Sequence, residues 1–287
     1  MPRNRRRRKR RWRKGRCAAM LAVAILIVAG VVFFVRGGAT KYTSINDGLG
    51  ESLVKANESA IDTSTGKDLK KSLYVPRKID TSKPMIAFTF DDGPKKGNTT
   101  RVVKALEKYD YRATFFMLGL SAATYPDEVK TVLKSGNEIS GHSWNHPQLT
   151  KIGASGVASQ ITRMNNAISK VTNSDVGLVR PPYGAYNDMV RATIDAPLVL
   201  WSIDTLDWKT RNVDATVNNI LKNAKDGDIV LMHDIHIQTV EAVEKVLPQL
   251  KEKGYEVCTV SELLEAKKIK AEKGDVIISA HQIIKKK

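Results

Sequence analysis

The sequence predicts an α/β domain, a distorted barrel of the (β/α)7 type, preceded by a single N-terminal transmembrane helix. The first observation behind this fold class is the alternation of short apolar runs with helix-like stretches from about residue 84 to residue 265. The second is the presence of polar residues at the end of nearly every apolar run. The third is an uncharged apolar run, residues 17–35, which follows a cluster of arginines.

The N-terminal segment predicts a membrane anchor. Residues 17–35 are long enough as a helix to cross the roughly 30 Å hydrocarbon core of a bilayer. A buried core helix and a cleavable signal peptide are the alternatives, the second because small residues at 37–39 could be cut. The basic arm 1–16 precedes the run, so the positive-inside rule places the N-terminus in the cytoplasm and the rest of the chain outside the membrane, as a single-pass membrane protein.

The net charge of +17 first suggests nucleic acid as a partner. The excess, however, belongs to the ends of the chain: the arm 1–16 carries eleven basic residues and no acid, and the Lys-rich tail 266–287 carries seven Lys against two acids. Residues 37–265 hold equal numbers of basic and acidic side chains. We therefore expect the membrane as a partner and no nucleic acid, while the tail could dock on anionic polymers or on the membrane.

Behind the anchor, residues 36–83 are polar and predict a stalk or irregular wrap, with LYVPR packing on the domain. The domain itself spans 84–265. Its expected strands are 85–90, 112–118, 137–142, 177–180, 198–203, 228–232 and 255–260. Its expected helices lie near 99–109, 124–135, 154–172, 187–195, 213–225, 238–253 and 261–268, with Asn187 and Tyr186 capping the fourth and Pro248 kinking or shortening the sixth.

Composition excludes other classes of protein. A hydrophobic content of 42% is too high for a disordered chain. Two cysteines, Cys17 and Cys258, are too few for a disulfide scaffold or a multi-cysteine zinc module. We expect a monomeric globular domain.

The polar residues at the ends of the expected strands predict one shared site. Parallel strands of an α/β barrel bring their carboxyl ends to the same face, where active sites are found. Residues far apart in the sequence would therefore be neighbours in space. The strand-end residues are Asp91, Asp92, His142, Arg180, Asp204, Asp207 and His233.

A metal site is predicted at this face. His142 and His146 are four residues apart, a spacing that places two imidazoles on one face of a helical turn. One carboxylate from the pair Asp91 and Asp92 would complete a set of three ligands and leave positions open for water and substrate. The other carboxylate would remain free to act as a base.

Five segments carry a family resemblance. In order they are TFDDGP, HSWNHP, RPPYGAY, DTLDW and the LMH of IVLMHD. They resemble the five motifs of the NodB-homology polysaccharide deacetylases, carbohydrate esterase family 4, over about residues 84–265. Within that family the chain is most similar to the membrane-anchored peptidoglycan N-acetylglucosamine deacetylases of Gram-positive bacteria.

The resemblance implies a role for each motif residue. Asp91 would be the general base, held by Arg180, and His233 the general acid, supported by Asp207. The implied metal ligands are Asp92, His142 and His146. The backbone N–H of Tyr183 would stabilise the oxyanion, while Trp208 and Leu231 would form the pocket for the acetyl methyl group.

The expected function is metal-dependent hydrolysis of the N-acetyl amide of N-acetylglucosamine in cell-wall peptidoglycan. The expected cofactor is one divalent ion, zinc first, with cobalt or another divalent ion possible. Other acetylated glycans are the alternative substrates: chitin oligomers, poly-N-acetylglucosamine, the muramic-acid sugar or xylan. A tethered glycan-binding protein without activity is a further alternative, but it should lack one of the motif residues.

Overall fold

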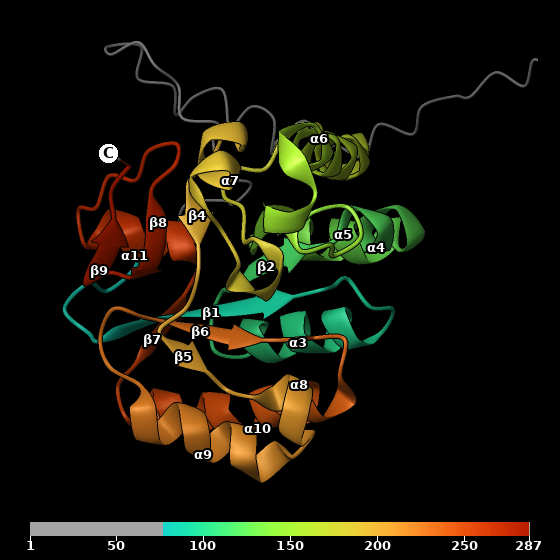
Figure 1. Ribbon diagram of the computed structural model, residues 1–287. Coiled ribbons are helices and arrows are strands. Elements are labelled where there is room, and N and C mark those ends of the chain that lie inside the picture. The colour runs from blue at the N-terminus through green and yellow to red at the C-terminus, as the bar shows by residue number, and fades with distance from the viewer. Residues whose placement is uncertain (1–76, 287) are drawn as a thin grey trace, which may run out of the picture. The chain divides into compact units, whose positions relative to one another are not determined.

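The computed structural model describes residues 77–286, which belong to one compact unit (Figure 1). The predicted arm, the anchor 17–35 and nearly all of the predicted stalk lie outside the described residues. Among residues 77–286, no helix combines the length and the apolar character needed to cross a membrane.

The described residues form an α/β fold with a mostly parallel sheet, as the alternating pattern predicts. The sheet order is β3–β2–β1–β6–β5, and β7 pairs with the first half of β1 while β2 pairs with the second half. β1 is the central strand, because β2, β6 and β7 all pair with it, and it is buried along its whole length. The strands of this sheet are β1 Met85–Asp91, β2 Thr114–Met117, β3 Glu138–Gly141, β5 Ile203–Asp204, β6 Asp228–Met232 and β7 Glu256–Cys258.

Several of the expected strands are shorter than the sequence suggests, and the runs 177–180 and 198–203 differ most. The run 177–180 contributes a single bridge residue, Val179, which pairs with Gly141 and with Leu198. The run 198–203 divides into β4, Leu198–Val199, and β5. Prolines at 181, 182 and 197 flank these runs, and proline has no N–H to extend a ladder. The pairings nevertheless lead from β3 through Val179 and the β4–β5 segment to β6, and so back to β1.

The helices pack on the sheet in two groups. α3 and α9 contact α10, and α4 and α5 contact α6. α4 and α8 were not expected, because each has six residues or fewer and too little length for a periodic signal. The helices are α3 Asn98–Glu107, α4 Gly119–Thr124, α5 Pro126–Lys134, α6 Gly153–Thr172, α7 Asp188–Thr193, α8 Asp207–Thr210, α9 Val213–Asn223, α10 Ile237–Glu252 and α11 Val260–Ala266, with short 3-10 turns at Leu149–Lys151 and Pro182–Gly184.

Two local predictions about helices can be compared with the structure. Asn187 caps α7, since its side chain accepts a hydrogen bond from the backbone N–H of Val190 at 3.0 Å, which confirms its expected role. Pro248 does not shorten α10, which continues to Glu252. The buried side chains Leu247 and Leu250 on both sides of Pro248 anchor this part of the helix in the core.

The C-terminal segment contains two strands that the sequence did not reveal. β8, Val276–Ser279, runs parallel to β4, and β9, Gln282–Ile284, returns antiparallel to β8. Val276 and Ile277 are fully buried. Residues 276–284, which the charge pattern assigned to a Lys-rich tail, therefore belong to the fold. The lysines of the tail come before and after them in the sequence.

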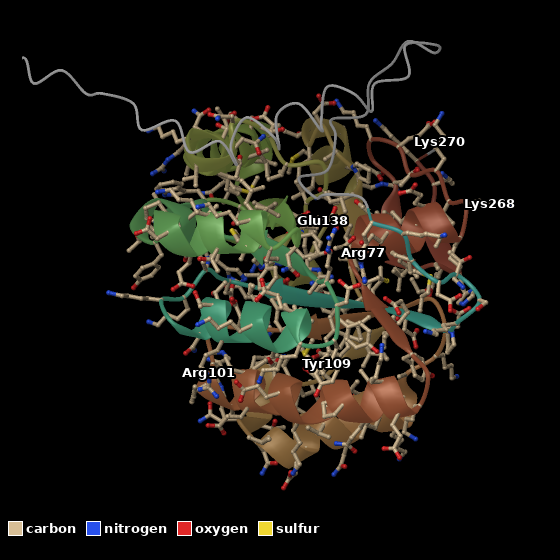
Figure 2. All side chains as sticks on the ribbon, turned by 180° about the vertical axis from the view of Figure 1, so that it is seen from behind. Arg77, Arg101, Tyr109, Glu138, Lys268 and Lys270 are labelled. Carbon is tan, nitrogen blue, oxygen red and sulfur yellow. The ribbon has the colours of Figure 1, made fainter. Side chains whose placement is uncertain are left out.

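Seen from behind, Arg77 lies against the sheet at the start of the described chain (Figure 2). Its guanidinium contacts Glu262 at 3.0 Å and Glu256 at 3.2 Å, and it donates to the backbone oxygen of Val257 at 3.1 Å. Of the LYVPR segment, which was expected to pack on the domain, the structure describes only this last residue, Arg77. On the same side, the buried carboxylate of Glu138 accepts from Thr114 Oγ1 at 2.7 Å.

Candidate active site

Three side chains converge at the carboxyl ends of β1 and β3. Asp92 follows β1, His142 follows β3, and His146 lies in the loop after His142. His142 Nε2 is 3.7 Å and His146 Nε2 is 3.6 Å from Asp92 Oδ1. One ligand atom from each of the three residues lies within 4.8 Å of the other two, which is close enough for all three to contact one ion.

The two histidines do not share a helical turn, so that detail of the prediction was wrong. Residues 142–148 form a loop in which Ser143 and His146 have positive φ angles of 77° and 66°. The backbone N–H of His146 donates to Ser143 Oγ at 3.1 Å and closes the loop. Asp92 has a φ angle of 72° as well. All three non-glycine residues therefore occupy a strained region of backbone space, as residues of functional sites often do.

The hydrogen bonds of His142 determine which ring nitrogen faces Asp92. Nδ1 lies 2.7 Å from the backbone oxygen of Arg180, and a carbonyl oxygen only accepts, so Nδ1 carries the proton. In the neutral ring Nε2 then carries the lone pair, and it faces Asp92 Oδ1. A backbone carbonyl behind the ring is the support that metal-binding histidines usually have.

The residues fit a divalent ion. Asp92 Oδ1 is buried and, within residues 77–286, has no hydrogen-bond partner, although it lies between both histidine nitrogens. Burial, together with the nearby His142, lowers the pKa of His146, which keeps that ring neutral and able to bind a metal. Two imidazoles and one carboxylate form a donor set that suits zinc and related ions.

Asp91 and Arg180 form a buried ion pair next to these three residues. Arg180 Nη1 donates to Asp91 Oδ1 at 2.7 Å and to Thr89 Oγ1 at 2.7 Å, and the side chain is fully buried. Its other nitrogens donate to the backbone oxygens of Val199 and Leu200. Asp91 Oδ2 is left free of the guanidinium and lies 3.7 Å from His142 Nε2. Arg180 thus fixes the orientation of the Asp91 side chain, with one oxygen directed toward the site.

Asp207 and His233 form a second pair. Asp207 Oδ1 lies 2.9 Å from His233 Nδ1, and Asp207 Oδ2 accepts from the backbone N–H of His233 and the hydroxyl of Thr239, both at 2.7 Å. Burial disfavours the charged imidazolium, but the hydrogen bond and charge of Asp207 outweigh it and raise the pKa of His233 to about 8. The charges of Asp91 and Asp92 act in the same direction, so His233 belongs to the same site.

The three residues expected to bind substrate differ in their exposure. Tyr183 is 67% exposed, with its ring centroid 4.5 Å from that of His146, and Trp208 is 47% exposed. Leu231 is buried in β6 and presents only 4% of its surface. Most of the exposed large apolar side chains in the described part of the chain come from segments beside the site: Leu120, Tyr183, Leu206, Trp208 and Ile237, with Ile284 as the exception.

Asp234 is a residue of this region that the motifs did not single out. It follows His233 and is fully buried, and burial raises its pKa to about 7 against a lowering contribution from Thr99. The sequence signal was present in the LMHD segment, where an acid follows the strand-end histidine. By itself, however, an acid after a histidine is equally typical of an exposed loop.

Comparison with known proteins identifies the family. The model of the family described as polysaccharide deacetylase matches residues 78–196. A peptidoglycan-N-acetylglucosamine deacetylase of Bacillus cereus is 40% identical over 209 residues, which cover 70% of this chain and 98% of that protein. The chain belongs to the polysaccharide deacetylase family. The peptidoglycan-N-acetylmuramic acid deacetylase PdaC of Bacillus subtilis is 37% identical over 232 residues, which cover 80% of this chain and 50% of PdaC.

Solved structures of the family agree with the fold. The structure of PdaC from Bacillus subtilis aligns with a TM-score of 0.65 at 39% identity, covering 66% of this chain and 94% of that one. A family 4 acetyl xylan esterase from Clostridium thermocellum, in complex with a cobalt ion, aligns with a TM-score of 0.65 at 27% identity, covering 68% and 98%. The chain spans about half the length of the first curated relatives that it matches.

Proposed function

We propose that this chain is a metal-dependent peptidoglycan deacetylase, which hydrolyses the N-acetyl amide of N-acetylglucosamine residues and releases acetate. The observation that carries the proposal is the arrangement of two ion pairs, Asp91 with Arg180 and His233 with Asp207, around the cluster Asp92, His142 and His146. Amide hydrolysis needs a base, an acid and an electrophilic centre, and this arrangement supplies a group for each.

Each ion pair prepares one side chain for proton transfer. When bound by Asp92, His142 and His146, a divalent ion would polarise the amide carbonyl and make a bound water more acidic. Asp91 Oδ2 accepts the proton of the attacking water, because Arg180 occupies Oδ1 and leaves Oδ2 free to face the site. His233 is largely protonated at neutral pH and donates a proton to the leaving nitrogen. The backbone N–H of Tyr183 is the proposed donor to the oxyanion.

The metal is proposed to be zinc, with cobalt as an alternative. The donor set of two imidazoles and one carboxylate supports zinc, and the relative from Clostridium thermocellum was solved with cobalt. Titration of the metal-free protein with each ion, followed by elemental analysis of protein isolated without added metal, tests this assignment.

The exposed apolar side chains beside the site support a glycan as substrate. Apolar faces such as those of Trp208 and Tyr183 pack on sugar rings, and Leu120 and Ile237 extend the exposed apolar surface beside the site. Leu231 would border the acetyl methyl group with the small part of its surface that is exposed.

We also propose a barrel of the (β/α)7 type as the framework, because the pairings return from β6 to β1.

The deciding experiment measures acetate release from peptidoglycan by the full-length protein in detergent. Mass spectrometry of muramidase-digested product distinguishes loss of acetyl from N-acetylglucosamine and from the muramic-acid sugar. The second is the competing substrate because PdaC is named for it. Acetyl xylan and chitin oligomers complete the panel. Asp91→Asn and His233→Ala should each abolish release, and Asp204→Asn, at the end of the neighbouring strand β5, serves as the matched control. Release unaffected by the first two substitutions would contradict the proposal.

We propose that residues 17–35 anchor the protein in the cell membrane as a single span with a cytoplasmic N-terminus and an outer catalytic domain. The charge asymmetry around the apolar run supports this topology. Protease added to intact protoplasts should digest the catalytic domain and leave a small N-terminal fragment with the membrane. Protection of the catalytic domain would contradict the topology. A monomer is proposed as the oligomeric state.

A further inference from the structure

Asp234 is a buried carboxyl group that the proposed chemistry does not use. It follows His233, and its side chain is fully buried. Oδ2 accepts a hydrogen bond from Thr99 Oγ1, which itself accepts from the backbone N–H of Lys95 at 2.8 Å. Oδ1 is buried without a hydrogen-bond partner in the described part of the chain. An unsatisfied buried oxygen costs free energy, so the contact that it makes is of interest.

The unpartnered oxygen lies against Gly93, the residue after Asp92. A Cβ atom added to Gly93 would lie 2.5 Å from Asp234 Oδ1, and the next two nearest atoms, at 3.0 and 3.1 Å, also belong to Asp234. The φ angle of Gly93 is not in the left-handed region, so its backbone accepts an alanine. The carboxyl group of Asp234 therefore fills the space that a side chain at Gly93 would need.

The turn that Asp234 contacts is the one that carries Asp92. With a φ angle of 72°, Asp92 keeps its conformation only if neighbouring groups hold it. Its backbone oxygen accepts from Ser121 Oγ at 3.2 Å, and that of Gly93 accepts from the N–H of Leu118 at 3.0 Å. Both of these restraints come from the segment after β2. Asp234 acts on the same turn from the segment after β6.

We infer that Asp234 is a positioning residue, whose carboxyl group presses on Gly93 and so holds Asp92 where it can bind a metal ion together with His142 and His146. The inference rests on the proposed metal site. It explains why a carboxyl group with an unpaired oxygen is kept beneath the site. Asp234 also connects the segment of His233 to the turn of Asp92, so that His233 and Asp92 keep a fixed position relative to each other.

The test is a double-mutant cycle between Gly93 and Asp234, with metal affinity as the readout. Zinc and cobalt dissociation constants are measured by chelator competition on full-length protein in detergent. Gly93→Ala should weaken binding at least tenfold, and Asp234→Ala by about 10- to 100-fold, the range for a residue that supports a ligand. The double variant should bind more tightly than Gly93→Ala alone, because the alanine then has room. Asp234→Asn, which keeps the shape, should retain wild-type affinity.

Asp275 provides the matched control. It is a buried carboxylate at the start of the β8 hairpin that accepts from the backbone N–H of Glu272 at 2.8 Å. Asp275→Ala should lower the unfolding midpoint without changing metal affinity. If Asp234→Ala fails to fold, Thr99→Val frees the carboxyl group from its hydroxyl partner and should weaken metal binding in the same direction.

Two outcomes overturn the inference: wild-type metal affinity in Asp234→Ala or Thr99→Val, or a double variant that binds no better than Gly93→Ala. Acetate release, measured on the same samples, reports on the proposed function separately. The expected pattern of affinities without any acetate release would support the positioning role and remove the proposed activity.

Discussion

Asp207 controls the protonation of His233, and the substitution Asp207→Asn measures that control. The carboxylate raises the pKa of His233 from 6.5 to about 8, against the effect of burial. A difference of about 1.5 pKa units corresponds to about 2 kcal/mol in favour of the imidazolium. Both Asp207 oxygens accept hydrogen bonds, Oδ1 from the backbone N–H of Trp208 and Oδ2 from the hydroxyl of Thr239. An asparagine would replace one of these oxygens by an NH2 group, which would then face a donor.

Without the Asp207 charge, the pKa of His233 falls from about 8 toward its ordinary value of 6.5, because burial disfavours the imidazolium and only the charges of Asp91 and Asp92 still favour it. At pH 7.5 the wild-type imidazole is about three-quarters protonated, and a group of pKa 6.5 is about one-tenth protonated. In the proposed mechanism, only the protonated ring can donate to the leaving nitrogen. We therefore expect kcat at pH 7.5 to fall by up to about eightfold and the alkaline limb of the pH profile to move down by up to about 1.5 pH units.

The assay is acetate release between pH 5.5 and 9.5, together with an NMR titration of the His233 ring in the metal-free protein. Asp204→Asn is the control, because Asp204 is three residues away and its side chain accepts from the backbone N–H of Leu206 at 2.9 Å, an interaction that asparagine preserves. An alkaline limb that stays in place in Asp207→Asn would refute the reasoning, as would an NMR pKa for His233 that does not change.

The same pKa shift predicts how stability depends on pH. His233 is raised above its unfolded value, so its contribution of about 2 kcal/mol is fully present below pH 6.5 and is lost as the pH rises through about 8. Denaturant titrations of the metal-free protein should show this decline between pH 6.5 and 9. Asp207→Asn should lack it, and a decline of equal size in both proteins would contradict the assignment to His233.

Three further predictions concern the ion pair, the metal and the C-terminal strands. Arg180→Met leaves the carboxylate of Asp91 buried and unpaired, and should cost about 3–5 kcal/mol in the free energy of unfolding at pH 7; a loss below about 1 kcal/mol would count against a buried ion pair. Chelation should lower the thermal midpoint of the wild type, since an ion at about 100 times its dissociation constant contributes about 2.7 kcal/mol, and His142→Ala should show no such response. A chain ending at residue 274 should lose about 3–6 kcal/mol because it lacks the buried Val276 and Ile277; equal denaturation midpoints for the two lengths would show that β8 adds nothing.

The positions of the central strands β1 and β6 could be predicted from the sequence because their signals are local. β1 is a run of apolar residues that ends in a polar pair, and β6 repeats that pattern before His233. The convergence of these polar ends follows from the parallel direction of the strands alone. The prediction that residues 91, 142, 180, 207 and 233 are neighbours therefore needed no knowledge of the loops.

The loops and the C-terminal strands could not be read in the same way. His142 and His146 have a helical spacing, but the left-handed conformations of Ser143 and His146 bring the rings together in a loop. Positive φ is uncommon for a non-glycine residue, and the residue type alone does not predict it at a given position. β8 consists of four residues between lysines, and only its pairing with β4, far back in the chain, shows that it belongs to the fold. Asp234 likewise becomes meaningful only through its contact with Gly93.

Arg180 contributes to the site with two chemically separate parts of one residue. Its guanidinium contacts Asp91, and its backbone oxygen accepts from His142 Nδ1 at 2.7 Å. Only the first part depends on the amino acid type. A substitution at this position can therefore abolish hydrolysis while the imidazole keeps its orientation. Such a variant would still bind the metal ion and the glycan, but it would not hydrolyse the glycan. Position 180 is thus the natural point at which a catalyst of this architecture could be converted into a binding protein by a single codon change.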